Sequence, residues 1–265
     1  MRLLVSVNDH HEAAAALAGG ADIIDAKDPA SGPLGAVSVQ TLREICSVSR
    51  DAYLVTAALG DADDERVIEH KARAYAQAGA ALVKVGFGGI TDLEHVVLLL
   101  AAAVRGVAAV DCRHHGVVAV AYVDGGVVAS VTPCELTPAA VKAGAVGVLL
   151  DTANKQGPGL RDLLPPRALA SWIAEAHDAG LLVAVAGRLR EHDLSTVRDA
   201  GADIAGVRGA ACEGGRTGRV TTERVRGLLA CLGPASPPGR ATRRTPTGCS
   251  CPREVPEGRV RPSTP

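Results

Sequence analysis

The sequence predicts an α/β fold, specifically a (β/α)8 barrel in which eight parallel strands are enclosed by helices. Short hydrophobic segments alternate along the chain with longer segments of helical periodicity, which is typical of repeated βα units. Several helical segments end in Ala-Gly directly before the next strand, as at Ala78-Gly79 and Ala143-Gly144, where glycine suits the left-handed residue after a helix. Eight such units in about 230 residues fit a barrel.

The expected elements follow one another in strict alternation. Strands are predicted at Leu3–Val7, Asp22–Ala26, Tyr53–Ala58, Leu82–Val85, Val117–Val123, Val146–Leu150, Leu181–Ala186 and Asp203–Val207. Helices are predicted at Asp9–Leu17, Val39–Ser47, Asp63–Gln77, Asp92–Val110, Pro138–Lys142, Arg167–Asp178, Glu191–Asp199 and Thr222–Leu232. A doubly wound open sheet is the alternative. It is less favoured because Asn8-Asp9-His10-His11 follows the first strand, where a dinucleotide-binding sheet has its glycine-rich turn.

The character of the chain changes after Gly233. We expect residues 1–233 to form the barrel domain and residues 234–265 to form a disordered tail, because the latter are rich in Pro, Arg, Ser, Thr and Gly without apolar periodicity. A basic tail of this kind can contact a nucleic acid or a partner, but solvated disorder is the favoured interpretation. Its removal is expected to leave stability and turnover nearly unchanged.

Composition argues against several classes of protein. The chain has 265 residues, of which 47% are hydrophobic and only 2% aromatic, so its core must consist of Ala, Val, Leu and Ile. A formal net charge of −1 argues against bulk attraction to nucleic acid or to an anionic membrane. Apolar runs are too short to span a bilayer and no signal-peptide pattern opens the chain, so a cytoplasmic location is expected. The composition is compatible with a homo-oligomer.

The cysteines and histidines predict neither a metal site nor a disulfide framework. The seven cysteines show no CxxC spacing, and the single close pair, Cys249 and Cys251, lies in the expected tail. The eight histidines fall in predicted helices or at their ends, and none closes a strand. We therefore expect activity without a metal or other cofactor.

Lysine is rare in this chain, and three of the five lysines stand where strands end. Lys27 ends the second predicted strand, Lys84 ends the fourth, and Lys155 follows the sixth. A biased coding composition also produces a shortage of lysine. Even so, arginine cannot replace lysine where an amine must deprotonate and attack a carbonyl.

These strand ends are expected to meet in one site. Alternate strands of a barrel contribute to the same interior layer, so Lys27, Lys84 and Asp151 should face one another at the carboxyl-terminal face, with Asp25 beside them. Burial and a neighbouring cation lower the pKa of a lysine, which favours Schiff-base formation or proton abstraction, and the carboxylates can orient the amines. The structural alternative is a set of ion pairs at the barrel rim.

Glycine-rich segments after the last two strands predict a phosphate site. Gly187 follows the seventh strand, and Arg208, Gly209 and Ala210 follow the eighth. In barrels, loops at these positions commonly bind phosphate through backbone N–H groups, and Arg208 is expected to add a charge-assisted contact. Tight turns are the alternative explanation of the glycines. The segment 214–219 extends the second loop and is expected to cover the site.

Taken together, the motifs resemble those of the (5-formylfuran-3-yl)methyl phosphate synthase family over roughly residues 2–232. The resemblance lies in a series of motifs in the right order, namely Leu3-Leu4-Val5-Ser6-Val7, Gly19-Gly20-Ala21-Asp22-Ile23-Ile24-Asp25-x-Lys27-x-Pro29, Gly32-x-Leu34-Gly35-Ala36, Lys84-Val85-Gly86, Leu150-Asp151-Thr152-Ala153-x-Lys155-x-Gly157, Ala186-Gly187 and Gly206-Val207-Arg208-Gly209-Ala210-Ala211-Cys212. Several ordered motifs are far more specific than any one of them alone.

The resemblance implies a lyase that condenses two molecules of glyceraldehyde 3-phosphate into a phosphorylated furan aldehyde, with loss of phosphate and water. It implies that Lys27 forms the Schiff base, that Lys84 accepts a proton, and that Asp25, Asp151 and Lys155 are further active-site residues. The product would supply methanofuran-type cofactors. Two alternatives are another class I aldolase acting on sugar phosphates, and a non-catalytic protein that binds a phosphorylated metabolite.

Overall fold

The computed structural model describes residues 1–49, 53–110 and 115–232, so the predicted boundary at 233 and the predicted tail lie outside the described residues. Its main sheet is a closed barrel of parallel strands in chain order, because β8 pairs with β1. This closure confirms the predicted barrel and excludes the open sheet. The strands are β1 (Arg2–Val7), β2 (Ile23–Ala26), β3 (Leu54–Asp61), β4 (Leu82–Gly86), β5 (Gly116–Tyr122), β6 (Gly147–Asp151), β7 (Leu182–Val185) and β8 (Ile204–Val207).

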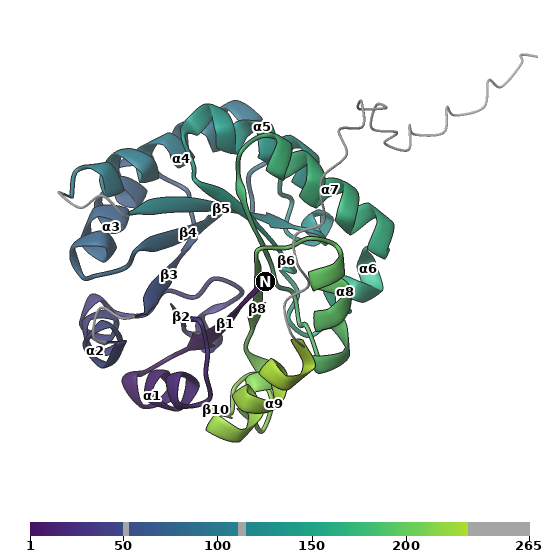
Figure 1. Ribbon diagram of the computed structural model, residues 1–265. Helices are drawn as coiled ribbons and strands as arrows, with labels where there is room; N and C mark the ends of the chain where they lie inside the picture. The colour runs from purple at the N-terminus through teal and green to yellow at the C-terminus, as the bar shows by residue number, and fades with distance from the viewer. Residues whose placement is uncertain (50–52, 111–114, 233–265) are drawn as a thin grey trace, which may run out of the picture. The chain divides into compact units, whose positions relative to one another are not determined.

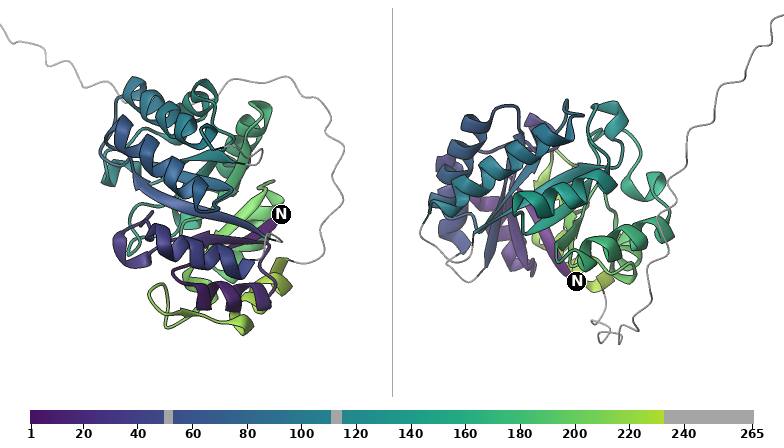
Figure 2. Two further views of the ribbon diagram at one scale, coloured as in Figure 1. Left: turned by 90° about the vertical axis from the view of Figure 1, so that its left-hand side faces the viewer. Right: turned by 90° about the horizontal axis from the view of Figure 1, so that it is seen from above.

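Helices form an outer layer around these strands (Figures 1 and 2). They are α1 (His10–Ala18), α2 (Val39–Ser49), α3 (Glu65–Gln77), α4 (Leu93–Ala108), α5 (Pro133–Ala143), α6 (Leu160–Leu163), α7 (Pro166–Asp178), α8 (Leu194–Asp199) and α9 (Thr222–Leu232). Short 3-10 turns occur at η1 (Pro29–Ser31), η2 (Gly125–Val127), η3 (Glu191–Asp193) and η4 (Gly209–Ala211). After β8, the short strands β9 (Cys212–Glu213) and β10 (Arg219–Val220) form an antiparallel hairpin.

Local sequence accounts for most helix ends. The glycines predicted to follow helices have left-handed backbone, for example Gly79 with φ 110° and Gly144 with φ 80°. Aspartates begin several helices as N-caps: Asp64 accepts from the backbone N–H groups of Arg66 and Val67. The Ala-Gly pattern therefore located helix ends correctly.

Four features differ from the expected elements. Helix α5 begins at Pro133 rather than Pro138, because Thr132 and Glu135 form a capping box with Pro133 as the first helical residue. The helix expected over Glu191–Asp199 is divided into η3 and α8. Helix α6 and the β9–β10 hairpin were not expected, since both are too short to show periodicity.

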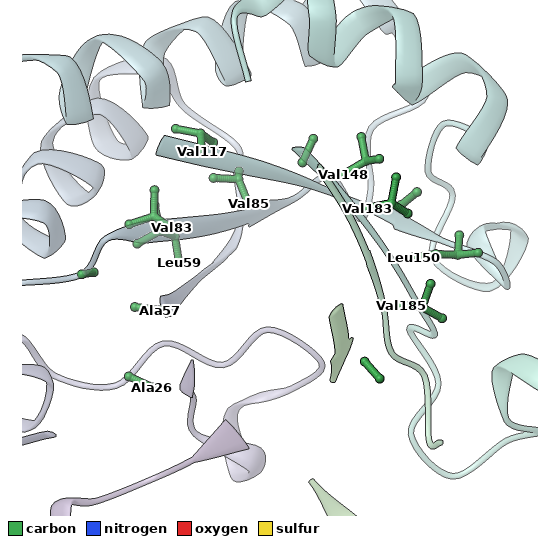
Figure 3. Close-up of a cluster of buried hydrophobic side chains, with 14 of the residues drawn as sticks. Ala26, Ala57, Leu59, Val83, Val85, Val117, Val148, Leu150, Val183 and Val185 are labelled. Atoms are coloured by element: carbon green, nitrogen blue, oxygen red, sulfur yellow. The ribbon is translucent and has the colours of Figure 1, made fainter. Parts of the chain in front are cut away.

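The two-residue period of the strands separates two apolar layers. Val83, Val85 and Leu150 point outward and pack against the helices (Figure 3). Residues of the other parity fill the barrel interior, where Leu4, Ile23, Val118, Val120 and Leu149 form a second cluster. Because side chains alternate along a strand, Lys84 between Val83 and Val85 must point inward.

Candidate active site

The carboxylate of Asp25 lies inside the barrel and is fully buried. Strand register places Ser6 of β1 and Thr56 of β3 on either side of it. Ser6 Oγ donates to Oδ2 and Thr56 Oγ1 donates to Oδ1, each at 2.8 Å, and Lys84 Nζ lies 2.5 Å from Oδ1. Asp25 and Lys84 therefore form a buried ion pair whose carboxylate is also satisfied by two hydroxyls, as a buried charge requires.

Lys27 directly follows β2, two residues after Asp25, so it continues on the same inward-facing side of the strand. Its Nζ lies 3.8 Å from Asp151 Oδ2, and its side chain is 11% exposed. Burial lowers the pKa of Lys27 to about 7; Asp151 opposes this effect, whereas Lys155 and Lys84 add to it. A substantial fraction of this amine is therefore uncharged near neutral pH.

Asp151, the last residue of β6, connects two of the lysines. Lys155 Nζ donates to Oδ1 at 2.6 Å, while Lys27 lies near Oδ2. Burial opposes the ionisation of Asp151, but Lys155, Lys27 and the Thr152 N–H outweigh it and hold its pKa below the ordinary value. Asp151 is therefore a carboxylate with Lys155 hydrogen-bonded to one oxygen and Lys27 near the other.

The loop that carries Lys155 is held by a residue that the sequence analysis missed. Asp124, in the loop after β5, accepts from Ala153 N at 2.6 Å and from Asn154 N at 2.9 Å. Asn154 Oδ1 in turn accepts from the backbone N–H groups of residues 156 and 157. A carboxylate two residues after the end of a strand, as in Tyr122-Val123-Asp124, was the available signal.

A second unpredicted group lies beside the end of β4. Tyr122 Oη donates to Asp61 Oδ1 at 2.9 Å, and Gly88 N donates to the same oxygen at 3.0 Å. Burial, followed by the charge of Asp61, raises the pKa of Tyr122 well above its ordinary value. Tyr122 is thus a neutral phenol and a hydrogen-bond donor. A side chain at Gly86 would collide with both Asp61 and Tyr122, which explains the glycine there.

A cavity of about 360 Å³ opens over these groups, a size typical of a small-molecule site. Basic side chains dominate its polar lining: Lys27, Lys84, Lys155, Arg188, Arg190, Arg208 and Arg216, together with Asp151. The predicted residues Gly187, Gly209 and Ala210 also line it. The structure thus brings together the strand-end lysines and the two glycine-containing loops that the sequence placed at one face.

The loop after β7 has unusual backbone geometry at the cavity. Gly187 has φ 98°, and Arg188 has φ 58°, which is uncommon for a residue other than glycine. A side chain at Gly187 would press on Leu160 and Thr152, at 3.0 and 3.2 Å. The turn therefore packs closely on the β6 loop while it presents Arg188 at the cavity.

Arg208 occupies a different environment from the one expected. Its guanidinium pairs with Glu12 of α1 and also donates to the carbonyl oxygens of Ser6, Arg216 and Gly218. These contacts use all five N–H groups of the side chain. Arg208 therefore ties the β8 loop to α1 and has no donor left for the phosphate contact expected of it.

Two further properties concern the described residues only. Among them, no group of three or more His, Cys, Asp or Glu side chains is arranged to hold a metal ion. Within the same ranges, no helix combines the length and the apolarity that crossing a bilayer requires.

Comparisons with known proteins identify the family of this chain. The family model for 4-HFC-P synthase matches residues 3–229. The (5-formylfuran-3-yl)methyl phosphate synthase of Methanocaldococcus jannaschii is 39% identical over 231 residues, covering 86% of this chain and 98% of that protein. The enzyme of the same name from Archaeoglobus fulgidus is 37% identical over 231 residues, with coverage of 86% and 98%.

Solved structures support the fold. KGPDC from Streptococcus mutans has a TM-score of 0.59 at 14% sequence identity, covering 88% of this chain and 98% of that one. A 3-hexulose-6-phosphate synthase has a TM-score of 0.57 at 21% identity, with coverage of 88% and 100%. At these identities the likeness concerns the barrel alone. The family match and the close relatives go further: the chain is an enzyme and belongs to the 4-HFC-P synthase family.

Proposed function

We propose that this enzyme condenses two molecules of glyceraldehyde 3-phosphate into (5-formylfuran-3-yl)methyl phosphate through a Schiff base on Lys27. The observation that carries the proposal is the buried amine of Lys27, whose pKa is lowered to about 7 in a cavity lined by cations. The name shared by its relatives supports the choice of product. We also propose that this product serves methanofuran-type cofactor synthesis.

The first step needs an uncharged amine. Lys27 Nζ attacks the aldehyde carbon of one triose phosphate, and loss of water from the carbinolamine gives an iminium. Asp151, 3.8 Å away, stabilises the positive charge that develops on nitrogen. The Lys155 ammonium, bound to the other oxygen of Asp151, is positioned to donate the proton that the departing hydroxyl needs.

The second step needs a proton to move at carbon. The iminium acidifies the adjacent C–H, whose loss gives an enamine that attacks the aldehyde of the second triose phosphate. We assign this proton transfer to the Lys84–Asp25 pair: Lys84 passes its ammonium proton to Asp25 Oδ1, 2.5 Å away, and the neutral amine then accepts the proton from carbon. Ring closure and release from Lys27 complete the reaction. The atoms balance when two triose phosphates lose one phosphate and two waters.

The cavity's charge supports a phosphorylated substrate. Basic side chains outnumber the carboxylate in its lining, so the interior attracts anions. The glycine-containing turns at Gly187 and Gly209 allow a phosphate to approach the backbone closely. We propose that these two loops hold substrate phosphate through N–H groups of Gly187, Gly209 and Ala210.

Incubation with glyceraldehyde 3-phosphate tests the proposal. We expect a furan ultraviolet absorbance and free phosphate to appear together, and borohydride to fix substrate mass on the peptide that contains Lys27. Lys27→Arg should abolish both, whereas Lys142→Arg, which changes an exposed lysine on α5, should not. An ordinary aldol product would favour the class I aldolase alternative, and label on a different lysine would refute the assignment of Lys27.

A further inference from the structure

Arg216 reaches the cavity from the turn of the β9–β10 hairpin. Gly214 and Gly215 have φ of 78° and 77°, and this left-handed pair turns the chain back toward the barrel. The backbone of Arg216 then packs over Gly209, where an added Cβ would lie 3.5 Å from Arg216 N. Arg216 is therefore next to one of the proposed phosphate-binding residues and lines the same cavity.

The Arg216 guanidinium is only partly used by the protein. It donates to the carbonyl oxygens of Pro29 and Gly32 in the β2 loop, the second at 2.8 Å. These contacts use two of its five N–H groups, and in the part of the chain that the structure describes the other three have no acceptor. It also forms no ion pair within 4.0 Å there, in contrast to Arg208.

Arg208 holds Arg216 in this position. Its Nε donates to Arg216 O at 3.0 Å, and its Nη2 donates to Gly218 O at 2.9 Å, so it binds two carbonyl groups of the turn between β9 and β10. Glu12 fixes Arg208 and also accepts from Val220 N at 3.3 Å. The two arginines thus have separate roles. All N–H groups of Arg208 bind the protein, whereas Arg216 lines the cavity with a guanidinium that keeps free N–H groups.

The charge of Arg216 lacks full solvation. Burial lowers the pKa of its guanidinium, and Arg208 adds to this effect, while Asp151 and Asp28 oppose it from a distance. An anion in the cavity would supply the counter-charge that no contacting side chain gives. A guanidinium with free N–H groups is also well suited to phosphate, because it can donate two parallel hydrogen bonds.

We propose that Arg216 is the arginine that binds substrate phosphate, and that Glu12 and Arg208 are the residues that position it. While its free N–H groups hold the phosphate, its contacts to Pro29 and Gly32 keep the β2 loop, which begins after Lys27, fixed against the β8 loop. The identity of the substrate rests on the proposed function, but the binding of a phosphate group does not.

Binding of inorganic phosphate tests the proposal independently of turnover. Isothermal titration should show that Arg216→Ala raises the Kd for phosphate by about tenfold or more, the loss expected for a charge-assisted contact. Arg216→Lys keeps the positive charge but not the paired N–H donors, so its Kd for phosphate should lie between those of the wild type and Arg216→Ala. Arg219→Ala is the matched control, because Arg219 lies in the same hairpin and pairs with Asp9 outside the cavity. An unchanged Kd in Arg216→Ala would overturn the proposal.

Borohydride trapping separates phosphate binding from loop support. Arg216→Ala should raise the concentration of glyceraldehyde 3-phosphate needed for half-maximal labelling of Lys27, and leave that for unphosphorylated glyceraldehyde nearly unchanged. If the concentration needed for half-maximal labelling rises equally for both aldehydes, Arg216 only supports the β2 loop, and its role as phosphate ligand is refuted. If the wild type makes no furan, the proposed reaction fails, yet the phosphate titration still decides the role of Arg216.

Discussion

Lys84 Nζ lies 2.5 Å from Asp25 Oδ1 inside the barrel, with side chains that are 7% and 0% exposed. A proton can pass between these groups without entering bulk water. As an ion pair, Lys84 starts as a proton donor, and it becomes a proton acceptor only after it has given its proton away. The pair is therefore suited to a reaction in which protons both leave carbon and join a departing oxygen.

Lys84→Arg should stop the reaction after the Schiff base. Arginine keeps the positive charge beside Asp25 but does not release its proton. We expect borohydride labelling of Lys27 to persist and furan formation to fall by about 10²–10⁴-fold, the usual value of general acid–base catalysis. Lys142→Arg serves as the control. Near-normal furan production by Lys84→Arg would assign Lys84 to binding or structure instead.

Thr56→Val should weaken both the fold and the reaction. The substitution keeps the shape of the side chain but removes one of the two hydroxyls that donate to Asp25. Leaving a buried acceptor short of one donor costs about 1–3 kcal/mol in the free energy of unfolding. Denaturant titration and furan assays should both detect the change. Thr91→Val, at an exposed position, should alter neither. If Thr56→Val has no effect, Lys84 and Ser6 are sufficient to satisfy Asp25.

The rate of Schiff-base formation should follow the titration of Lys27. Because its pKa is lowered to about 7, the initial rate of borohydride trapping should rise about tenfold per pH unit below 7 and level off above it. A lysine at the ordinary value of 10.5 would show a rising rate well beyond pH 9. Rates measured between about pH 5 and 9 distinguish the two cases.

The lowered pKa of Lys27 also predicts how the free energy of unfolding depends on pH. The unfolded chain, with Lys27 at 10.5, binds more protons than the folded chain at pH values between about 7 and 10.5. The Lys27 contribution therefore makes the free energy of unfolding increase with pH across this window. Below pH 7, where Lys27 is protonated in both states, burial of its charge destabilises the folded chain by the full amount. Lys27→Met should remove this component. Denaturant titrations of the wild type and Lys27→Met at several pH values should show that the difference between their free energies of unfolding becomes smaller as the pH rises.

Glu12→Gln should destabilise the enzyme strongly. The side chains of Glu12 and Arg208 are 1% and 7% exposed, and removing the carboxylate leaves Arg208 buried without a counter-charge. The expected loss is about 3–5 kcal/mol in the free energy of unfolding. Glu223→Gln, at an exposed position on α9, should cost less than about 0.5 kcal/mol. A Glu12→Leu/Arg208→Met double variant should recover part of the loss, and its failure to do so would locate the effect outside the pair.

The sequence was sufficient for the barrel because its signals are local. Ala-Gly at helix ends and hydrophobic strands at a regular spacing require no knowledge of distant residues, and both patterns agree with the structure. The meeting of Lys27, Lys84 and Asp151 followed from the same logic, since parallel strands end at one face. Their chemical roles remain predictions.

Contacts between residues far apart in the sequence explain why parts of the site could not be predicted. Glu12 stands in an alanine-rich helix, and nothing nearby shows that it faces an arginine 196 residues away. Arg208 was therefore assigned to the substrate, although its N–H groups serve the protein. Asp124 was missed for a similar reason, because its partners lie 29 and 30 residues further along the chain.

The late position of the β9–β10 hairpin has a consequence for biosynthesis. The loop after Lys27 is fixed by Arg216, and β1 pairs with β8, so the site is incomplete until the segment from β8 to Arg216 has left the ribosome. Before that, Lys27 has the ordinary lysine pKa of 10.5 and is almost entirely protonated. In the nascent chain the protonated amine of Lys27 therefore reacts slowly with aldehydes, and it becomes reactive when the barrel closes around it and lowers its pKa.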